Sequence, residues 1–433
     1  MMIGEIRGQD PTKMRGREGK MVCKEKAYYE WGIVILLSLL FGTVMLNRLA
    51  IVYLFPFIIA EFKITYTQAG ALTSILAITS AFATWFFGGL SDRVGRKIIL
   101  IPATIFFSIM SWFSGVTYGF LQMLLARGLM GMGQGAVLPA SVATISAEST
   151  PTRRGFNFGL HQALIPVIAL GIGPILVTQF TKIMSWRIVF FIVGIPGLII
   201  SIILYFYMRE PKPTLFREEG KVLEGPAERP GFFAPLRYRN IILSSVINVL
   251  MLGGLFSFST FSIVYLTKEV HLSISDAGIV VSFLFTMFFG CILLPLLSDH
   301  VGRKPIIIPS LFATGLCFFG FILSGSNFFL LAIWVSIAGF AIGGVGPIAV
   351  SAITTESVPP HLVATASAVP FSIGEIFGSA LMPFLAGYLC DLYGLKMALF
   401  FSAVAPLIAG FMGLFYEETA PKILAKKVAP ATS

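Results

Sequence analysis

Residues 90–102 read LSDRVGRKIILIP, and residues 297–309 read LSDHVGRKPIIIP. The two stretches align at an offset of 207 residues. A second alignment, at an offset of 208, joins Gly131, Gly135, Pro139, Glu148, Ser149 and Pro151 to Gly339, Gly343, Pro347, Glu356, Ser357 and Pro359. A chain that repeats itself over such a distance is built from two similar halves. The sequence therefore predicts an internal duplication.

The composition is that of a polytopic membrane protein. Of the 433 residues, 56% are hydrophobic and only 12% are charged, which is too few for a soluble surface. Apolar runs long enough to cross a bilayer recur along the whole chain. They predict an all-α protein with twelve transmembrane helices, at 31–60, 67–90, 98–118, 120–147, 155–181, 186–208, 240–266, 274–297, 305–324, 327–354, 361–388 and 395–417.

These helices predict five segments. A cytoplasmic tail covers 1–30, and the first six-helix bundle covers 31–208. A central loop rich in Pro, Glu and Arg covers 209–239. The second six-helix bundle covers 240–417, and a second tail covers 418–433. The duplication implies that the bundles have parallel topology and are related by an axis along the membrane normal.

The positive charges predict the orientation. With the N-terminus inside, 24 of the 31 Lys and Arg residues fall in cytoplasmic segments, so both termini are expected in the cytoplasm. The first apolar run starts too late and is too long for a signal peptide. The same charge bias explains the net charge of +10 without a nucleic-acid partner. The expected location is the inner (plasma) membrane.

The loop motif identifies a family resemblance. GGLSDRVGRK at 88–97 resembles the signature loop between the second and third helices of the major facilitator superfamily. ARGLMGMGQG at 126–135 resembles the fourth-helix pattern of that superfamily. The resemblance implies two bundles that rock around a central site and give alternating access. The second loop departs from the pattern, since Pro295 replaces the usual glycine and His300 the usual arginine.

Charged residues at these loops have two interpretations. Basic residues in short inner loops set topology. Paired with acids, they can also form charge-assisted hydrogen bonds that latch one state at the seam between the bundles. The repeat favours the latch, because an aspartate recurs in both copies. The candidate gating residues are Asp92, Arg93, Arg96, Asp299, Arg303, Glu148 and Glu356.

Arg48 lies at least 12 residues, or about 18 Å, from either end of the first predicted span. An arginine at such a depth costs about 2.5–3.5 kcal/mol or more, so it should face the bundle interior or water. One interpretation is a buried structural ion pair. The other is binding of an anionic substrate, for which the planar guanidinium is suited.

Other polar residues inside the spans complete the candidate site. Glu375 is an acid inside a span, and burial disfavours its charged form, so it is either a proton carrier or a permanent partner of Arg48 or Arg127. Arg127 is expected to serve proton coupling or interhelical hydrogen bonding. His161 is read as a core residue or a proton relay. The neutral residues expected to line the substrate cavity are Asn47, Gln134 and Gln162.

A closer resemblance concerns the anion:cation symporters, a group that includes sugar-acid transporters. Asn47-Arg48 in the first span, with Arg127 followed seven residues later by Gln134, is similar to their pattern. In that group the arginine that matches Arg48 binds the substrate carboxylate. An acid usually stands where this chain has Gln134, and often where it has Asn47, so proton coupling must move elsewhere or be absent.

The sequence thus predicts a secondary transporter of a small organic anion, with Arg48 binding a carboxylate and Glu375 taking a proton. Alternatives are an uncoupled facilitator or anion exchanger, and a drug/proton antiporter. The antiporter pattern is only partly kept in GIGPILVTQF at 171–180. No catalytic cluster indicates an enzyme, and the four scattered cysteines indicate no metal site. No cofactor is expected, and the protein is expected to act as a monomer in the bilayer.

Overall fold

The chain folds into helices in a computed structural model that describes residues 11–150, 153–209, 234–359, 362–421 and 423. This described part contains helices and no strand. It forms twelve spans: α1 (Pro11–Phe62); α2 (Tyr66–Val94); α3 (Arg96–Gly115); α4 (Phe120–Glu148); α5 (Arg154–Ile165), η1 (Pro166–Ile172) and α6 (Gly173–Phe180); α7 (Trp186–Tyr207); α8 (Arg239–Lys268); α9 (Ile274–Ser282), η3 (Phe283–Thr286) and α10 (Met287–Val301); α11 (Lys304–Leu323); α12 (Phe328–Gly346), η4 (Pro347–Ala352) and α13 (Ile353–Glu356); α14 (Val363–Ile373), η6 (Gly374–Leu381) and α15 (Met382–Tyr393); and α16 (Lys396–Gly413).

Eleven of these spans, among the described residues, are long and apolar enough to cross a membrane. The span outside this set is α4, which carries Arg127, two glutamines and four glycines among its apolar residues. It nevertheless packs against α2 and α3 inside the first bundle. Its polarity therefore reflects the interior of the protein rather than a position outside the membrane.

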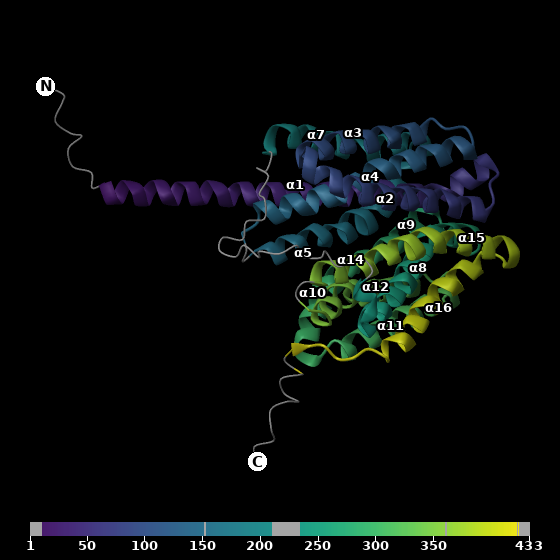
Figure 1. Cartoon of the computed structure of the whole chain (residues 1–433). Helices are drawn as coiled ribbons and strands as arrows, with labels where there is room; N and C mark the ends of the chain where they lie inside the picture. Colours follow the sequence, from purple (N-terminus) through teal and green to yellow (C-terminus); the bar gives the residue numbers. More distant parts are fainter. Residues whose placement is uncertain (1–10, 151–152, 210–233, 360–361, 422, 424–433) are drawn as a thin grey trace, which may run out of the picture.

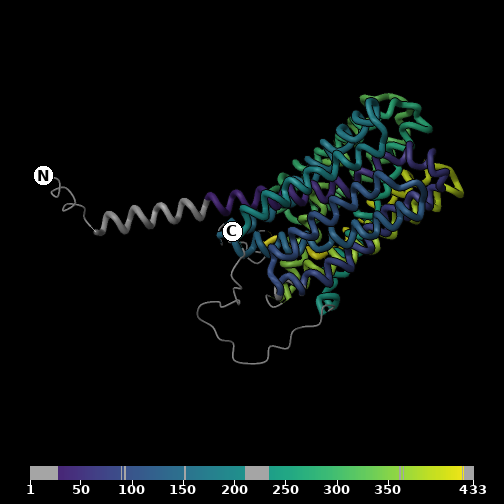
Figure 2. The backbone as a smooth tube through the Cα atoms, turned by 90° about the horizontal axis from the view of Figure 1, so that it is seen from above, coloured from purple at the N-terminus to yellow at the C-terminus, as the bar shows by residue number. Residues whose placement is uncertain are grey.

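The spans form two six-helix bundles, as the duplication predicts. Figure 1 shows the first six spans, purple to teal, above the last six, green to yellow. Figure 2 shows these helices lying side by side along the long direction of the molecule. Because the number of spans is even, α1 enters and α16 ends at the same end of the molecule, which we call the terminal end (Figure 1). The opposite end is called the far end.

Two features differ from the predicted spans. Helix α1 begins at Pro11, well before the predicted start at residue 31, and projects from the bundle (Figure 1). Lys, Arg, Glu and Met are frequent in that segment and favour helix without needing an apolar environment. The other difference is that four spans are interrupted by π- or 3-10-helical turns, two of which start at a proline, Pro166 and Pro347. A proline lacks the N–H of a regular helix turn, so the backbone there rearranges.

The two bundles are joined by hydrogen bonds at the far end. The backbone N–H groups of Tyr66 and Thr67, at the start of α2, donate to the carboxylate of Asp391 near the end of α15, at 2.9 and 2.8 Å. Gln179 of α6 donates to Ser275 of α9 at 2.6 Å. These contacts tie the second span to the eleventh and the fifth to the eighth. They hold the far end together.

Candidate functional site

An ion pair connects the two bundles near the middle of the spans. Arg48 Nη2 of α1 lies 3.2 Å from Glu375 Oε2 of η6. The side chains are only 8% and 22% exposed. The sequence offered an ion pair and an anion site as alternative roles for Arg48. The structure shows the pair, at the seam between the halves.

Two further side chains of the second half surround the guanidinium. Arg48 Nη2 also donates to Ser379 Oγ at 3.1 Å. Ser379 Oγ lies 2.8 Å from Glu375 Oε2, so the serine bridges the cation and the acid. The centroid of the Phe256 ring of α8 lies 4.8 Å from the guanidinium carbon, within the range of a cation–π contact. Four groups from three spans therefore form the candidate site.

The local sequence GEIFGS explains how the acid and the serine reach Arg48. Glu375 and Ser379 are four residues apart in the π-helical segment η6, so they lie on one side of it. Single π-helical turns within α-helices are frequent at functional sites. Gly374 and Gly378 let this segment approach α8 closely, because an added Cβ would overlap the Asn248 side chain or come within 2.7 Å of the Val249 carbonyl oxygen.

Arg127 of α4 holds α1 in place by hydrogen bonds to its backbone next to the Arg48–Glu375 pair. It is fully buried, and its guanidinium donates to the carbonyl oxygens of Asn47 at 3.2 Å and Arg48 at 2.7 Å. These two carbonyls belong to the turn that carries Arg48. This geometry matches the interhelical hydrogen-bonding role predicted for Arg127. Its alternative role in proton coupling stays a prediction.

Asn47 and Gln134 point into the first bundle rather than toward Glu375. Asn47 Nδ2 donates to the carbonyls of Thr43 and Val193, both at 3.0 Å. Gln134 Nε2 donates to Val44 O at 3.2 Å. The amide oxygens of both residues are buried without a partner in the described protein. The structure therefore does not bring these predicted cavity residues to the ion pair.

His161 and Gln162 lie on different sides of α5. His161 is 1% exposed and stacks on Phe41, with ring centroids 4.7 Å apart. Its Nε2 has no hydrogen-bond partner within the described ranges. Gln162 is exposed on the next face of the helix. The two residues predicted to share one cavity are thus separated, and only His161 lies within the first bundle.

Three of the candidate gating residues form a network within the second bundle. Arg303 Nη1 lies 2.6 Å from Asp299 Oδ1, and Arg303 Nη2 lies 2.6 Å from Glu356 Oε1. Thr419, beyond the end of α16, donates to Glu356 Oε2 at 2.7 Å. The network joins the ends of α10, α13 and the segment after α16. In this structure it does not cross the seam between the bundles, where the latch was predicted.

The structure describes fewer side chains at the corresponding positions of the first bundle. Arg96 Nη1 donates to the Ala143 carbonyl of α4 at 2.8 Å. Glu148 is half-buried at the end of α4. The side chains of Asp92 and Arg93 lie outside the described residues. The predicted latch on this side stays a prediction.

Sequence reasoning missed Ser379 and Asp391. Serine is common in helices, and only its spacing of four residues from Glu375 marks Ser379 as a neighbour. Asp391 is exposed at the far end, where an acid is ordinary, and nothing in its surroundings along the chain indicates that it binds α2. A third missed residue is Glu30, which is 2% exposed and accepts from Asn157 Nδ2 at 2.9 Å, although it was assigned to the tail.

Solved structures resemble this fold over nearly the whole chain. The crystal structure of a bacterial homologue of the human lysosomal transporter Spinster, inward-facing and unoccupied, has a TM-score of 0.74 and 21% identity. It covers 93% of this chain and 99% of that chain. The nucleoside transporter NupG has a TM-score of 0.73 and 15% identity, covering 90% of this chain and all of that one. At these identities the likeness shows the fold alone.

Sequence relatives include transporters of several kinds. A probable 4-methylmuconolactone transporter of Cupriavidus pinatubonensis is 26% identical over 335 residues, 76% of each chain. The hexuronate transporter of Bacillus subtilis is 26% identical over 63% of this chain and 65% of its own length. The quinolone resistance protein NorA of Staphylococcus aureus is 24% identical over 52% of this chain and 56% of its own length.

The family match covers most of the chain. The family model described as Major Facilitator Superfamily matches residues 37–370 and 250–432. These matches cover both bundles and agree with the duplicated twelve-span fold. The family and the first two of these relatives are transporters and not enzymes. The chain therefore belongs to the major facilitator superfamily of membrane transporters.

Proposed function

We propose that the protein is a secondary transporter of small organic anions, in which Arg48 binds the substrate carboxylate. The observation that carries this proposal is the Arg48–Glu375 pair at the seam between the bundles. A guanidinium that holds one carboxylate presents the charge and the donors that a second carboxylate needs. The names of two relatives, a 4-methylmuconolactone and a hexuronate transporter, also point to small organic acids.

Binding and protonation are coupled through this pair. A substrate carboxylate competes with Glu375 for Arg48. Once displaced, Glu375 is left mostly buried and without its cation, and its neutral form is then favoured, so it takes a proton. A monoanion and one proton thus move together without net charge. An uncompensated charge would cost about 2.3 kcal/mol per 100 mV of opposing membrane potential.

Alternating access follows from the same displacement. The far end is held by contacts such as that between Thr67 and Asp391, so we infer that Arg48 is reached from the terminal end. The pair ties α1 to η6 across the seam, and its release lets the bundles move relative to each other. In this account both termini are cytoplasmic in an inner (plasma) membrane. The Arg303 network would re-form across the seam as a latch when the terminal end closes.

Transport by the purified protein in liposomes tests this proposal. Uptake of a panel of carboxylates is measured with imposed pH and voltage gradients, for wild type and for Arg48→Gln. The expected result is proton-driven uptake of at least one carboxylate and its loss in Arg48→Gln. Wild-type rates in Arg48→Gln would show that Arg48 does not bind substrate. Lys182→Gln, a change in the loop before α7, serves as the charge-matched control.

The same assay separates this function from two others. Exchange of one carboxylate for another without any effect of the pH gradient would indicate an anion exchanger or an uncoupled facilitator. Asn47 and Gln134 favour such a carrier, because neither side chain can take up and release a proton. Export of cationic drugs against the pH gradient would indicate a drug/proton antiporter, an alternative that the match to a quinolone resistance protein favours only weakly.

A further inference from the structure

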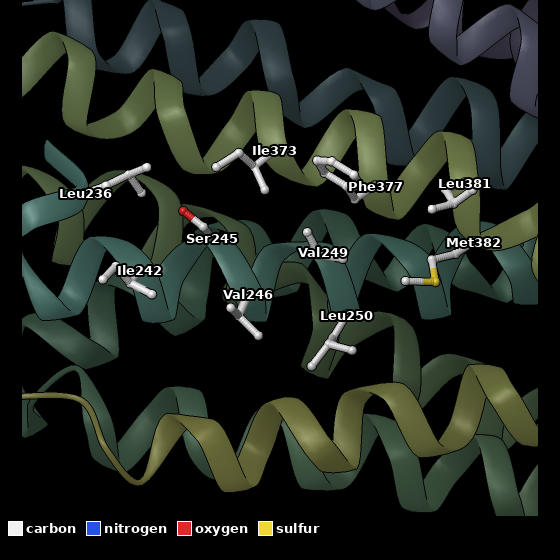
Figure 3. Close-up of a pocket in the computed structure, with 10 residues that line it drawn as sticks. All are labelled: Leu236, Ile242, Ser245, Val246, Val249, Leu250, Ile373, Phe377, Leu381 and Met382. Carbon is white, nitrogen blue, oxygen red and sulfur yellow. The ribbon is translucent and has the colours of Figure 1, made fainter. Parts of the chain in front are cut away.

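An apolar groove of about 430 Å³ runs between α8 and the eleventh span (Figure 3). Ile242, Val246 and Val249 line it from α8. Ile373 and Phe377 line it from the opposite side, and Figure 3 shows the side chains of the two helices facing each other across it. Ile242 is 48% exposed and Phe377 is 50% exposed. The groove is therefore open along its length.

The groove offers an occupant no hydrogen bond from a side chain. Its one polar lining residue, Ser245, is buried and donates its hydroxyl to the Ile241 carbonyl at 2.8 Å, within α8 itself. A polar ligand would lose its hydration there without compensation. Since both walls belong to membrane-spanning helices, a hydrocarbon chain is the occupant that fits.

Positive charge lies where the groove reaches the terminal end of the molecule. Leu236 lines this end, and the next residue, Arg237, is exposed. Arg239 is also exposed, but it lies 3.8 Å from Glu417 and is partly neutralised by it. Arg237 has no ion-pair partner in the part of the chain that the structure describes. A guanidinium at the membrane boundary, beside an apolar groove, is suited to a lipid phosphate.

The groove and the candidate functional site lie on different faces of the same helical segment, η6. Ile373, Phe377 and Leu381 recur every four residues and face the groove. Glu375 and Ser379 alternate with them and face Arg48. The π-helical segment η6 carries both sets, apart from Ile373, which directly precedes it. Whatever fills the groove therefore contacts the face of η6 that points away from Arg48.

We propose that this groove binds an anionic phospholipid of the leaflet at the terminal end, with an acyl chain between α8 and η6 and the phosphate on Arg237. The bound lipid holds η6 in the position from which Glu375 reaches Arg48. The binding site does not depend on which substrate the protein carries. Only its influence on transport rests on the proposed function.

The test is lipid binding by the purified, substrate-free protein. Native mass spectrometry and thermal unfolding compare phosphatidylglycerol with phosphatidylcholine of the same acyl chains. Phosphatidylglycerol should bind more tightly and raise the unfolding temperature more. Arg237→Gln should weaken this preference about fivefold, because a cation near the membrane surface contributes about 1 kcal/mol to anionic lipid binding. Val246→Trp, which fills the groove, should abolish the tight binding of both lipids.

Two controls make the result specific. Arg154→Gln removes another exposed cation at the terminal end, and Ile202→Trp enlarges another exposed apolar residue, on α7. Neither should alter binding. Equal binding of the two lipids, an unchanged preference in Arg237→Gln, or equal losses in Arg154→Gln would overturn the proposal. If Val246→Trp does not fold, the Arg237→Gln comparison still decides it.

Discussion

Arg48 lies deep in a membrane-spanning helix, where an isolated charge would be unstable. Glu375, Ser379 and Phe256 provide a counter-charge, a hydrogen-bond acceptor and an aromatic face. All three belong to the second half, whereas Arg48 belongs to the first. Breaking such a buried pair from one side leaves an uncompensated charge, which typically costs about 3–5 kcal/mol. A substrate that supplies its own carboxylate avoids that cost.

Helix geometry explains why some predicted site residues lie elsewhere. Adjacent residues on an α-helix point about 100° apart, so neighbours such as Asn47 and Arg48 point in different directions. The same holds for His161 and Gln162. Sequence reasoning identified Arg48 and Glu375 from the rarity of charge in apolar spans. It had no means of telling which neighbour of each faces the seam, because that depends on how twelve helices pack.

Arg127→Lys tests the support of α1 at the residue scale. Lysine keeps the charge but lacks the fork that reaches the carbonyls of both Asn47 and Arg48. Loss of one charged hydrogen bond should lower the free energy of unfolding by about 1.5–3 kcal/mol. Denaturant unfolding in detergent checks this, with the exposed Arg154→Lys as control. Equal stability of the two variants would contradict the supporting role.

At the scale of elements, glycines set the distance between helices. Gly131 and Gly135 of α4 pack on α2, where an added Cβ would overlap the carbonyl oxygens of Leu76 and Ser80. Gly343, the repeat equivalent of Gly135, packs on the Met287 carbonyl in the same way. Gly131 and Gly135 form a G-x-x-x-G pattern, which is typical of close packing between membrane helices. The π-helical turns were not predictable, because two start at a proline and one at Gly374, and no shared sequence pattern marks them.

Gly135→Ala should therefore destabilise the first bundle. Its new methyl group has no space against Ser80 O and Ala83 Cβ, and such overpacking typically costs about 1–3 kcal/mol. Gly128→Ala, in the same helix, would meet only Ile75 Cγ1 at 3.5 Å and Thr79 Cγ2 at 3.9 Å, which are ordinary contacts. Thermal unfolding of both variants measures the difference. A Gly135→Ala variant as stable as Gly128→Ala would contradict the packing argument.

Glu418 fixes the segment after α16 to the start of α11. Its carboxylate accepts from the backbone N–H groups of Arg303 at 2.8 Å and Lys304 at 3.1 Å. Burial alone would raise the pKa of Glu418, but hydrogen bonds from the backbone of Ala420, Arg303, Lys304 and Thr419 outweigh it and lower the pKa. The carboxylate also lies at the first turn of a helix, where negative charge is favourable.

This lowered pKa predicts the pH dependence of stability. A group with a lowered folded-state pKa contributes its stability above its unfolded pKa, about 4.3 for Glu, and loses it as the pH falls through the folded value. Glu418→Gln should lose about 1 kcal/mol at pH 7, like the loss of a helix cap. The difference from wild type should shrink below about pH 4. A difference that stays constant down to pH 3 would contradict the role of ionised Glu418.

At the scale of the whole molecule, the duplication yields two similar bundles with a site that neither contains alone. Arg48 comes from the first bundle and its partners from the second, so a ligand that binds Arg48 as proposed would act directly on the contact between the halves. The fold and the two bundles were predictable, since span length, charge bias and the repeat all act along the chain. The pairing across the seam was not, since it joins residues 327 positions apart.

Asp391→Ala should weaken the closure of the far end. The variant removes the acceptor for the N–H groups of Tyr66 and Thr67 and for the Thr67 hydroxyl. Loss of even one charged hydrogen bond should shift the equilibrium between the closed and the open far end about tenfold or more toward the open state. Distances between spin labels at positions 63 and 393 would then include a larger population of long distances. An unchanged distance distribution would show that this contact does not hold the far end.

The central claim is that Glu375 takes up a proton when a substrate carboxylate displaces it from Arg48. The most direct measurement counts protons moved per carboxylate in liposomes, for wild type and for Glu375→Gln. We predict one proton for each monoanion in wild type, and carboxylate exchange without proton movement or pH-driven accumulation in the variant. The same proton count in Glu375→Gln as in wild type would contradict the account.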